Sequence, residues 1–301
     1  MTLHIVVLKG GISAEREVSL SSGAAIEKAL LALGHRVTAI DVSASLAEDL
    51  ARAKPDVAFN ALHGRYGEDG CVQGLLELLR IPYTHSGVLA SALAMDKPMA
   101  KRIFSAAGLR CAEGITAHKD DLMGRDVMPR PYVVKPANEG SSVGVKILFP
   151  KDNFFFAHSN WPYGETVLVE RYIPGREITV AVLDDVPLGV TEITTKSGFY
   201  DYDNKYTEGG SIHICPANLP KAKYDEGMQL ALTAHRALGC RSLTRSDFRY
   251  DEAGDGHFYI LETNTQPGMT PLSLSPELAA HAGLGFNELV ARILASARLD
   301  A

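Results

Sequence analysis

The stretch Lys135-Pro136-Ala137-Asn138-Glu139-Gly140-Ser141-Ser142-Val143-Gly144 decides how the fold is interpreted. Its lysine ends a short β-rich run and opens directly onto a loop of glycines and serines. Glycines let a backbone approach an anion closely, N–H groups and hydroxyls can point at phosphate oxygens, and the lysine adds a point charge. The loop lacks the G-x-x-x-x-G-K-[ST] pattern of a P-loop. It predicts a loop that holds a nucleoside triphosphate, with a plain turn as the alternative.

Composition limits the class of protein. The 301 residues are 46% hydrophobic and 22% charged, which is enough for a full core and suggests roughly two domains at about 150 residues each. The net charge of -6 and a pI near 5.9 argue against a basic surface. We therefore expect no nucleic-acid partner and no membrane partner, and any affinity for polyphosphate must come from a local basic cluster.

The cysteines and the first residues indicate a compartment. The four cysteines are scattered, without a CxxC pair, so neither a disulfide framework nor a zinc site is expected: Cys71, Cys111, Cys215 and Cys240. Residues 1–4 lack a basic region before the apolar run 5–8, and no run approaches the ~18 apolar residues of a membrane span. We expect a cytoplasmic protein with reduced thiols.

Strands and helices alternate in the first part of the chain. Residues 5–8, 37–41 and 57–60 are β-rich, and residues 22–33 and 46–53 are helix-like. This alternation predicts a doubly wound parallel sheet. Functional groups gather beyond the carboxyl ends of such strands, so the loops at residues 10–15 and 62–70 should face the same cleft.

The pattern changes after a helical stretch at residues 90–107. Strand-like runs follow at residues 132–135, 143–148, 167–173 and 178–183, the last before an Asp184-Asp185 turn. They predict a mixed, largely antiparallel module. Residues 200–212 are polar, aromatic and glycine-rich without periodicity, which predicts a long loop of the kind that forms lids or is disordered.

Oxygen-bearing side chains lie on two predicted strands near the end, at residues 242–250 and 257–264. Glu262 and Asn264 share one face because side chains alternate along a strand. If Asp247 meets that face, the three side chains suit a hard cation such as Mg²⁺, although a solvated hairpin fits the pattern equally well. Arg245 should project to the same side and could hold developing negative charge.

Several motifs together carry a family resemblance: Gly10-Gly11 with Ser13-Ala14-Glu15-Arg16-Glu17-Val18-Ser19, His63-Gly64, Met95-Asp96-Lys97, the loop 135–144, Glu262-Thr263-Asn264-Thr265 and Pro267-Gly268-Met269-Thr270. Spread over residues 9–294, they resemble the D-alanine:D-alanine ligases of the ATP-grasp superfamily. The resemblance implies an α/β and α+β protein, in which an N-terminal doubly wound parallel sheet (pre-ATP-grasp) precedes an ATP-grasp fold of two subdomains. The implied domains are an α/β substrate domain at 1–95, a central subdomain at 96–180, and a C-terminal subdomain at 181–301 with a mobile loop at 200–212.

The resemblance also implies a site for ATP and metal ions. Its nucleotide residues fall into phosphate-binding lysines, an adenine hinge and a ribose contact: Lys97, Lys135 and Lys205; Glu170, Arg171, Tyr172 and Ile173; and Glu177. Without the family, Lys97 would be taken for a surface cation. Asp247, Glu262 and Asn264 match the ligands of two Mg²⁺ or Mn²⁺ ions.

The implied reaction joins two D-alanine molecules for peptidoglycan synthesis through an acyl phosphate and a tetrahedral intermediate. Glu15 matches the anchor of the first D-alanine's ammonium group, and His63 a substrate-site histidine. Without the family, these two would be taken for a helix-capping charge and a turn residue. The remaining matches are an oxyanion hole, a site for the second carboxylate and a hydroxyl pair that links Glu15 to the mobile loop: Arg245 with the N–H of Gly268; Ser273 with Leu274; and Ser141 with Tyr206.

Specificity and assembly are implied in the same way. The Lys205-Tyr206 pair favours the dipeptide over the ester that relatives make from D-lactate, and the family is usually dimeric. His85 and Ser242 stand where glycine is frequent in the family, and Gln266 is a further departure, within the motif from Asn264 to Gly268.

Three other interpretations are weighed. Residues 140–144 fit G-x-S-x-G, so Ser142 could be the nucleophile of a hydrolase, but residues 143–148 are β-rich where a nucleophile elbow needs a helix. A nucleotide-binding protein without catalysis would have no need of Arg245. The alternative among active relatives is a ligase with another amino or hydroxy acid, such as D-lactate, as second substrate.

Overall fold

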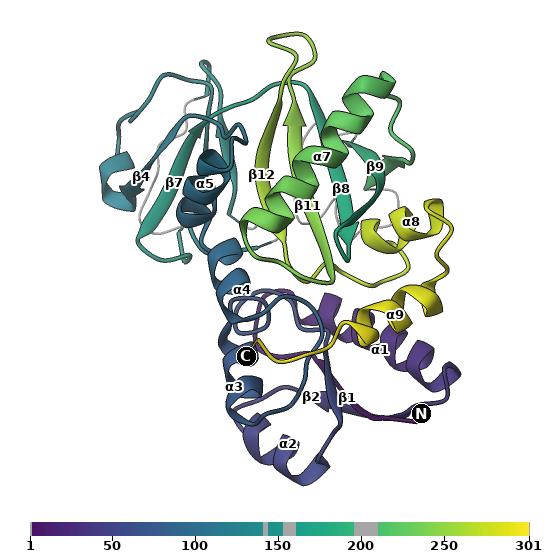
Figure 1. The fold of residues 1–301 in the computed structure, drawn as a ribbon. Coiled ribbons are helices and arrows are strands. Elements are labelled where there is room, and N and C mark those ends of the chain that lie inside the picture. Colours follow the sequence, from purple (N-terminus) through teal and green to yellow (C-terminus); the bar gives the residue numbers. More distant parts are fainter. Residues whose placement is uncertain (1, 141–143, 153–160, 196–209, 301) are drawn as a thin grey trace.

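The computed structural model describes residues 2–140, 144–152, 161–195 and 210–300. The described chain forms one parallel sheet and two antiparallel sheets, with helices against them (Figure 1). The parallel sheet and its helices form the lower half of Figure 1, and the two antiparallel sheets stand beside each other above it. The mixed α/β and α+β class predicted from the sequence is confirmed.

The parallel sheet has the order β2-β1-β3, with β1 (His4–Lys9), β2 (Arg36–Asp41) and β3 (Val57–Asn60). Ile5 and Val7 pack on the side of α1 (Arg16–Ala32), whereas Val6 and Leu8 pack against α2 (Leu46–Ala53) and α3 (Cys71–Leu78). Since neighbouring residues of a strand point to opposite faces, β1 is buried on both sides. The predicted doubly wound sheet is confirmed.

Two helix boundaries differ from the prediction. The first helix begins at Arg16 rather than at residue 22. The sequence pattern missed its first turns because the buried side includes small residues such as Ser19 and Gly23, which hide the apolar period. The predicted helix at 90–107 is two helices, α4 (Val88–Met95) and α5 (Lys97–Ala106). Asp96 has extended backbone angles, and its side chain accepts a hydrogen bond from the N–H of Met99, so one helix ends and the next begins there.

The four-stranded sheet has the order β4-β7-β5-β6, with β4 (Gly114–His118), β5 (Tyr132–Pro136), β6 (Lys146–Leu148) and β7 (Thr166–Arg171). A short 3₁₀ helix, η1 (Lys119–Leu122), follows β4. The pairs within this sheet are antiparallel, as predicted, but β4 was not anticipated from the sequence.

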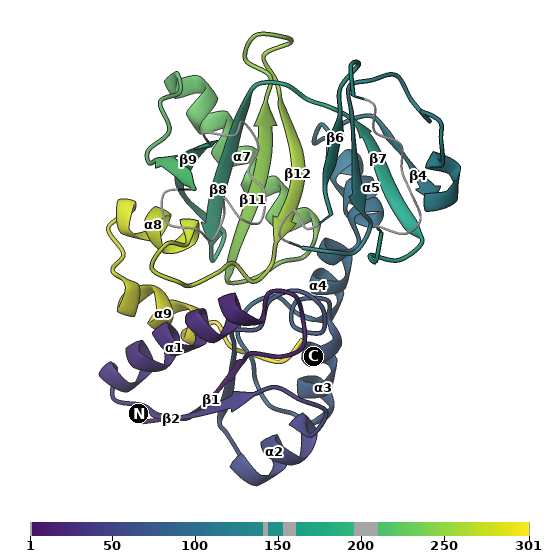
Figure 2. The same cartoon turned by 180° about the vertical axis from the view of Figure 1, so that it is seen from behind.

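The five-stranded sheet has the order β10-β9-β8-β11-β12, with β8 (Arg176–Leu183), β9 (Val186–Thr195), β10 (Ser211–Ile214), β11 (Leu243–Tyr250) and β12 (Phe258–Asn264). Helix α7 (Lys221–Ala237) covers one face, and Figure 2 shows the sheet beside the four-stranded one. The turn between β8 and β9 has positive φ at Asp184 and Asp185, as in the hairpin predicted there. The long loop predicted at 200–212 is too long at its end, since β10 begins at Ser211, and residues 200–209 lie outside the described chain.

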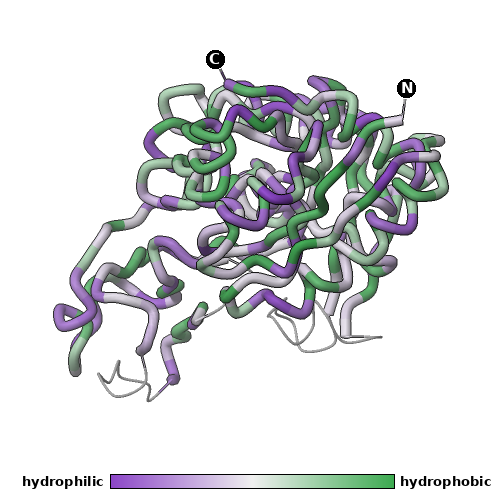
Figure 3. Tube along the Cα trace, turned by 90° about the horizontal axis from the view of Figure 1, so that it is seen from below, coloured by the Kyte–Doolittle hydropathy of each residue, from purple (hydrophilic) through white to green (hydrophobic). Residues whose placement is uncertain are grey.

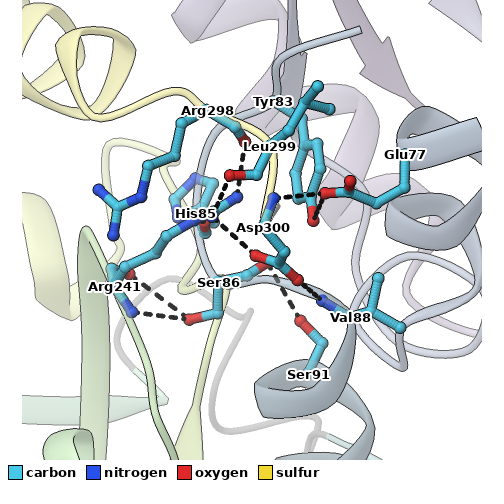
Figure 4. A network of polar contacts seen from close by, with 10 residues as sticks. All are labelled: Glu77, Tyr83, His85, Ser86, Val88, Ser91, Arg241, Arg298, Leu299 and Asp300. Atoms are coloured by element: carbon cyan, nitrogen blue, oxygen red, sulfur yellow. Dashed lines mark hydrogen bonds and ion pairs between the residues drawn. The ribbon is translucent and has the colours of Figure 1, made fainter. Parts of the chain in front are cut away.

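The last helices return to the parallel sheet. Helix α8 (Leu274–His281) contacts the five-stranded sheet, and α9 (Phe286–Ala295) packs against α1 in the same core as Ile5. In Figure 4 the buried guanidinium of Arg241 donates to the backbone oxygens of His85 and Arg298 and pairs with Asp300 at 2.8 Å. The loop before β11 is thereby joined to the parallel-sheet domain.

His85 and Ser242, the two departures from frequent glycines, share one backbone property. Their φ angles are 67° and 59°, in the left-handed region that glycine enters without strain. The geometry that favours glycine is therefore kept, although a side chain is present.

Hydrophilic and hydrophobic residues alternate closely along the described trace in Figure 3. Among the described residues, no helix combines the length and the apolar composition needed to cross a bilayer.

Candidate active site

The loops that were expected to share a cleft lie together. The hydroxyl of Ser13 donates to the backbone oxygen of His63 at 2.7 Å. A Cβ atom added at Gly64 would lie 2.8 Å from Oε2 of Glu15, and one added at Gly140 would lie 2.9 Å from the same oxygen. The Glu15 carboxylate is thus held between the His63 loop and the loop that follows Lys135. Its side chain forms no capping hydrogen bond on α1, so the capping role is not observed.

A second buried carboxylate, Glu68, lies beside Glu15 and was missed from the sequence. Its Oε1 accepts a hydrogen bond from the N–H of Gly64 at 2.9 Å. Burial, followed by the negative charge of Glu15, raises the pKa of Glu68 well above its ordinary value. A cation such as an ammonium group that binds beside this pair would favour its ionised form. The Gly-rich composition of residues 62–70 was the available signal.

His63 is buried next to these carboxylates. Its Nε2 lies 3.2 Å from the hydroxyl of Ser22, and the N–H of Met269 donates to that hydroxyl at 3.1 Å. Burial lowers the pKa of His63 to about 4, although a hydrogen bond with the backbone of Gln266 opposes the shift. The imidazole is therefore neutral at pH 7 and acts as a hydrogen-bonding group rather than a cation.

The strands β11 and β12 pair as the sequence argument required. Asp247 stands opposite Glu262, and Arg245 stands opposite Asn264. The guanidinium of Arg245 donates to both oxygens of Asp247, from Nε at 3.0 Å and from Nη2 at 2.9 Å, and the hydroxyl of Thr179 donates to Oδ1 at 2.5 Å. Arginine and carboxylates are thus brought together at one end of the strand pair.

The implied metal ions would need oxygen donors from Asp247, Glu262 and Asn264. Within the described residues, no group of three His, Cys, Asp or Glu side chains is arranged to hold a metal by itself. Asp247, Glu262 and the amide oxygen of Asn264, which accepts the N–H of Gln266 at 2.9 Å, are all oxygen donors on paired strands. They fit a hard cation that takes its other ligands from phosphate oxygens.

Three lysines from α5 and β5 pair with carboxylates near the site. Nζ of Lys97 lies 3.4 Å from Oε2 of Glu262 and donates to the backbone oxygen of Glu139. Lys135 and Lys101 both pair with Glu170, the former at 2.5 Å. Lys97 is therefore a largely buried group that joins the α5 segment to β12, and not a surface cation.

The three-residue cluster of Lys135, Lys101 and Glu170 is almost fully buried. Burial alone would raise the pKa of Glu170, but the charges of Lys135 and Lys101 outweigh it and the pKa is lowered. Lys101 was missed from the sequence. It lies four residues after Lys97 on the same helix, a spacing that places two side chains on one face and was the available signal.

The residues expected to contact the base and the ribose continue from Glu170. The guanidinium of Arg171 lies over the ring of Tyr259 at 5.6 Å, and Tyr172 packs edge-on against Phe149. Ile173 is buried in a small apolar cluster, and Oε2 of Glu177 lies 3.3 Å from Nη1 of Arg249. Apolar and aromatic surface next to a carboxylate suits an adenosine group.

Ser273 and Leu274 lie at the start of α8, and Gly268 lies in the loop before it. A Cβ atom at Gly268 would lie 2.9 Å from the hydroxyl of Ser273, and that hydroxyl accepts the N–H of Thr270 at 3.0 Å. The backbone of Gly268 thus approaches a hydroxyl group closely, which only glycine permits. Ser141, Ser142, Lys205 and Tyr206 lie outside the described residues. After Ser142 the described chain continues into strand β6, not into the helix of a hydrolase elbow.

Two antiparallel sheets that stand side by side, with Lys97 of α5 paired with Glu262 of the five-stranded sheet, fit the architecture of an ATP-grasp enzyme. The chain belongs to the D-alanine–D-alanine ligase family: residues 41–86 match the model of the D-ala D-ala ligase N-terminus, and residues 112–295 match that of the C-terminus. A D-alanine–D-alanine ligase from Methylocella silvestris is 55% identical over the whole of both chains. One from Cereibacter sphaeroides is 56% identical over 96% of this chain and 94% of its own.

Two solved structures are similar over nearly the entire chain. A D-alanine–D-alanine ligase from Bacillus anthracis is 34% identical, with a TM-score of 0.84, and covers 98% of this chain and 97% of its own. A D-alanine–D-alanine ligase from Bacillus anthracis complexed with ATP gives a TM-score of 0.82 at 30% identity, with the same coverage. The predicted family and fold are therefore confirmed.

Proposed function

We propose that the protein joins two D-alanine molecules into D-alanyl-D-alanine at the expense of ATP, for peptidoglycan synthesis. One observation carries this proposal: the Glu15 carboxylate lies against Gly140, in the same loop that begins at Lys135. An amino acid whose ammonium group is held at Glu15 would lie beside phosphates held at Lys135. Full-length identity above 50% to curated ligases supports the same reaction.

In the proposed first step, the carboxylate of one D-alanine attacks the γ-phosphorus of ATP, which forms an acyl phosphate and releases ADP. Lys97 and Lys135 balance the phosphate charges, and they are already buried beside carboxylates, so little reorganisation is needed. When bound to Asp247, Glu262 and Asn264, two Mg²⁺ or Mn²⁺ ions would neutralise phosphoryl oxygens. Arg171, Tyr172, Ile173 and Glu177 would position the base and the ribose.

In the proposed second step, the amine of the second D-alanine displaces phosphate from the acyl group. Arg245 and the N–H of Gly268 would hold the oxyanion, an effect of roughly 3 to 4 kcal/mol per donor. Ser273 and Leu274 would bind the second carboxylate. His63, which is neutral, would line the site of the first substrate.

The remaining proposals rest on the family resemblance. Ser141 with Tyr206 would link Glu15 to the loop that contains Lys205, and this loop would exclude water, because an acyl phosphate otherwise hydrolyses. We also propose a homodimer in the cytoplasm, which sedimentation and cell fractionation would test.

Phosphate release from ATP and Mg²⁺ with D-alanine tests the proposed function, with product identification by mass. L-alanine alone and D-alanine with D-lactate are the controls. We expect release that depends on D-alanine, with D-alanyl-D-alanine as product. An ester from D-lactate would favour the alternative second substrate, and ATP binding without release under any of these conditions would contradict the ligase.

Arg245→Ala tests the oxyanion role within the same assay. We expect turnover to fall by about 10²- to 10³-fold while ATP binding stays nearly intact, because the contact strengthens as charge develops. Equal losses in ATP binding and turnover would contradict this role.

A further inference from the structure

A large cavity opens beside the start of α8. It has a volume of about 910 Å³ and is lined by α1, β10, the loop before α8, α8 itself and α9. On α1 the lining residues include Ala25, Ala29 and Ala32, whose small side chains recur on one face of the helix and leave this space open. Ser273 lines the cavity too, so it reaches the hydroxyl next to Gly268.

The cavity contains few charges. Its charged or titratable lining side chains, among the residues that the structure describes, are Lys28, His213 and Glu277. Nδ1 of His213 lies 3.0 Å from Oε2 of Glu277, and Nε2 lies 3.2 Å from the hydroxyl of Ser211. Lys28 is exposed at the cavity on the α1 side.

Glu277 places a carboxylate close to the site proposed for the second substrate's carboxylate. Glu277 lies in the first turn of α8, one turn after Ser273 and Leu274. A bare carboxylate there would repel a second carboxylate that approaches Ser273. Because Nδ1 of His213 lies within hydrogen-bond distance of Glu277, an N–H there can donate to the carboxylate and weaken its repulsion of an approaching anion. Lys28 is the cationic side chain of the described lining.

We propose that this cavity is the entrance for the second substrate, a small amino acid with a free carboxylate, and that His213 and Lys28 give it an electrostatic preference for that carboxylate. The proposal rests on the proposed function, because the second carboxylate site at Ser273 and Leu274 belongs to it. His213 is a positioning residue, since it acts through Glu277. Lys28 attracts the carboxylate on its way in.

Two acceptors of the acyl group, hydroxylamine and D-alanine, distinguish a role in recognising the second carboxylate from a general loss of activity. Hydroxylamine traps an acyl phosphate as a hydroxamate and has no carboxylate, whereas D-alanine needs one to be recognised. Hydroxamate formation is measured first, and it gives the D-alanine concentration at which the first step is saturated. Above that concentration, dipeptide formation gives the half-saturating concentration of D-alanine as the acceptor. Any hydroxamate formed by the wild type reports the first step alone.

Replacing His213 or Lys28 by Ala should raise half-saturation for the acceptor about threefold to tenfold and leave hydroxamate formation unchanged. Glu277→Gln should lower it, and adding Glu277→Gln to His213→Ala should restore the acceptor constant. Matched controls are Lys221→Ala, an exposed helical lysine, and Glu288→Gln, in the first turn of α9. Neither should change the constant.

Unchanged acceptor constants in both His213→Ala and Lys28→Ala would overturn the proposal, as would a failure of Glu277→Gln to rescue His213→Ala. Equal loss of hydroxamate and dipeptide formation would also overturn it, since the residues would then support the fold. If His213→Ala does not fold, Lys28→Ala and Glu277→Gln still decide. Absence of D-alanine-dependent hydroxamate in the wild type would instead contradict the proposed function itself.

Discussion

The nucleotide side and the first-substrate side of the site balance their charges in opposite ways. At the four-stranded sheet, Lys135 and Lys101 are paired with Glu170, whose pKa is lowered. At the parallel sheet, Glu15 and Glu68 lie close together, and burial followed by the charge of Glu15 raises the pKa of Glu68. Under the proposed function, the first region would offer cations to phosphate, and the second would offer a pair of acidic groups whose ionised form an ammonium group favours.

Glu170→Gln should have the largest effect on stability, because it removes the carboxylate that pairs with Lys135 and Lys101. It would leave two ammonium groups buried without their carboxylate, so we expect a loss of about 3 to 5 kcal/mol in the free energy of unfolding. Denaturant unfolding measures this loss. Asp225→Asn, which removes an exposed helical pair with Lys221, is the control and should cost less than about 0.5 kcal/mol. Equal effects of the two substitutions would show that the Glu170 cluster does not carry stability.

The same chemical change at Glu68 should have the opposite effect on stability. Because the folded-state pKa is raised, the wild type loses stability as pH rises above about 4.3, the usual value for glutamate, toward the folded-state value. Glu68→Gln removes this loss, so its stability relative to wild type should increase with pH. Half-saturation for the first D-alanine should rise about tenfold, because an amide, unlike the Glu68 carboxyl, cannot ionise when an ammonium group binds beside it.

Hydroxamate formation measures the half-saturation of Glu68→Gln for D-alanine, and unfolding at several pH values measures its stability. Glu17→Gln, at an exposed position, is the control. A destabilised Glu68→Gln protein at pH 8 would mean that this carboxylate is paired like Glu170, and the contrast between the two regions would fail.

His63 sharpens the contrast through acid sensitivity. Burial lowers its pKa to about 4 in the folded protein, against about 6.5 unfolded, so the unfolded chain binds the extra proton between these values. Stability therefore falls as pH drops from 6.5 to 4. His63→Gln should reduce that slope by about one proton, or about 1.4 kcal/mol per pH unit. An unchanged slope in urea unfolding, equal to that of exposed His281→Gln, would contradict the buried neutral imidazole.

Ser242→Gly gives the smallest expected effect. Ser242 has a φ of 59°, and its buried hydroxyl has no hydrogen-bond partner among the described residues. Glycine removes both costs but adds freedom to the unfolded chain, so we expect a gain of about 0.5 kcal/mol. Ser242→Ala keeps the strain and serves as the control in thermal unfolding. A loss of stability in Ser242→Gly would show that the hydroxyl has a structural partner.

Strand patterns made part of the site predictable. The period of two placed Glu262 and Asn264 on one face, and the structure supplies the condition that the prediction needed, since it pairs Asp247 with Glu262. The alternation of strands and helices likewise predicted the parallel sheet. These features depend on residues close together in the sequence, where local geometry sets direction.

Contacts between distant loops could not be predicted from such patterns. Whether Glu15 caps a helix or turns toward Gly64 and Gly140 depends on how three loops meet. The pairing of His213 with Glu277 likewise depends on where β10 lies relative to α8. The break at Asp96 was missed because the apolar pattern continues through it, although Pro98 and the capping aspartate were visible signals.

The most direct test of the central claim compares Lys135→Met with Glu15→Gln in hydroxamate formation, with ATP and D-alanine each varied in turn. The claim that phosphate and ammonium are held in separate regions predicts a reciprocal pattern: half-saturation for ATP rises in Lys135→Met, and that for D-alanine rises in Glu15→Gln. If both constants rise equally in both variants, the two regions do not divide the substrates between them, and the account is contradicted.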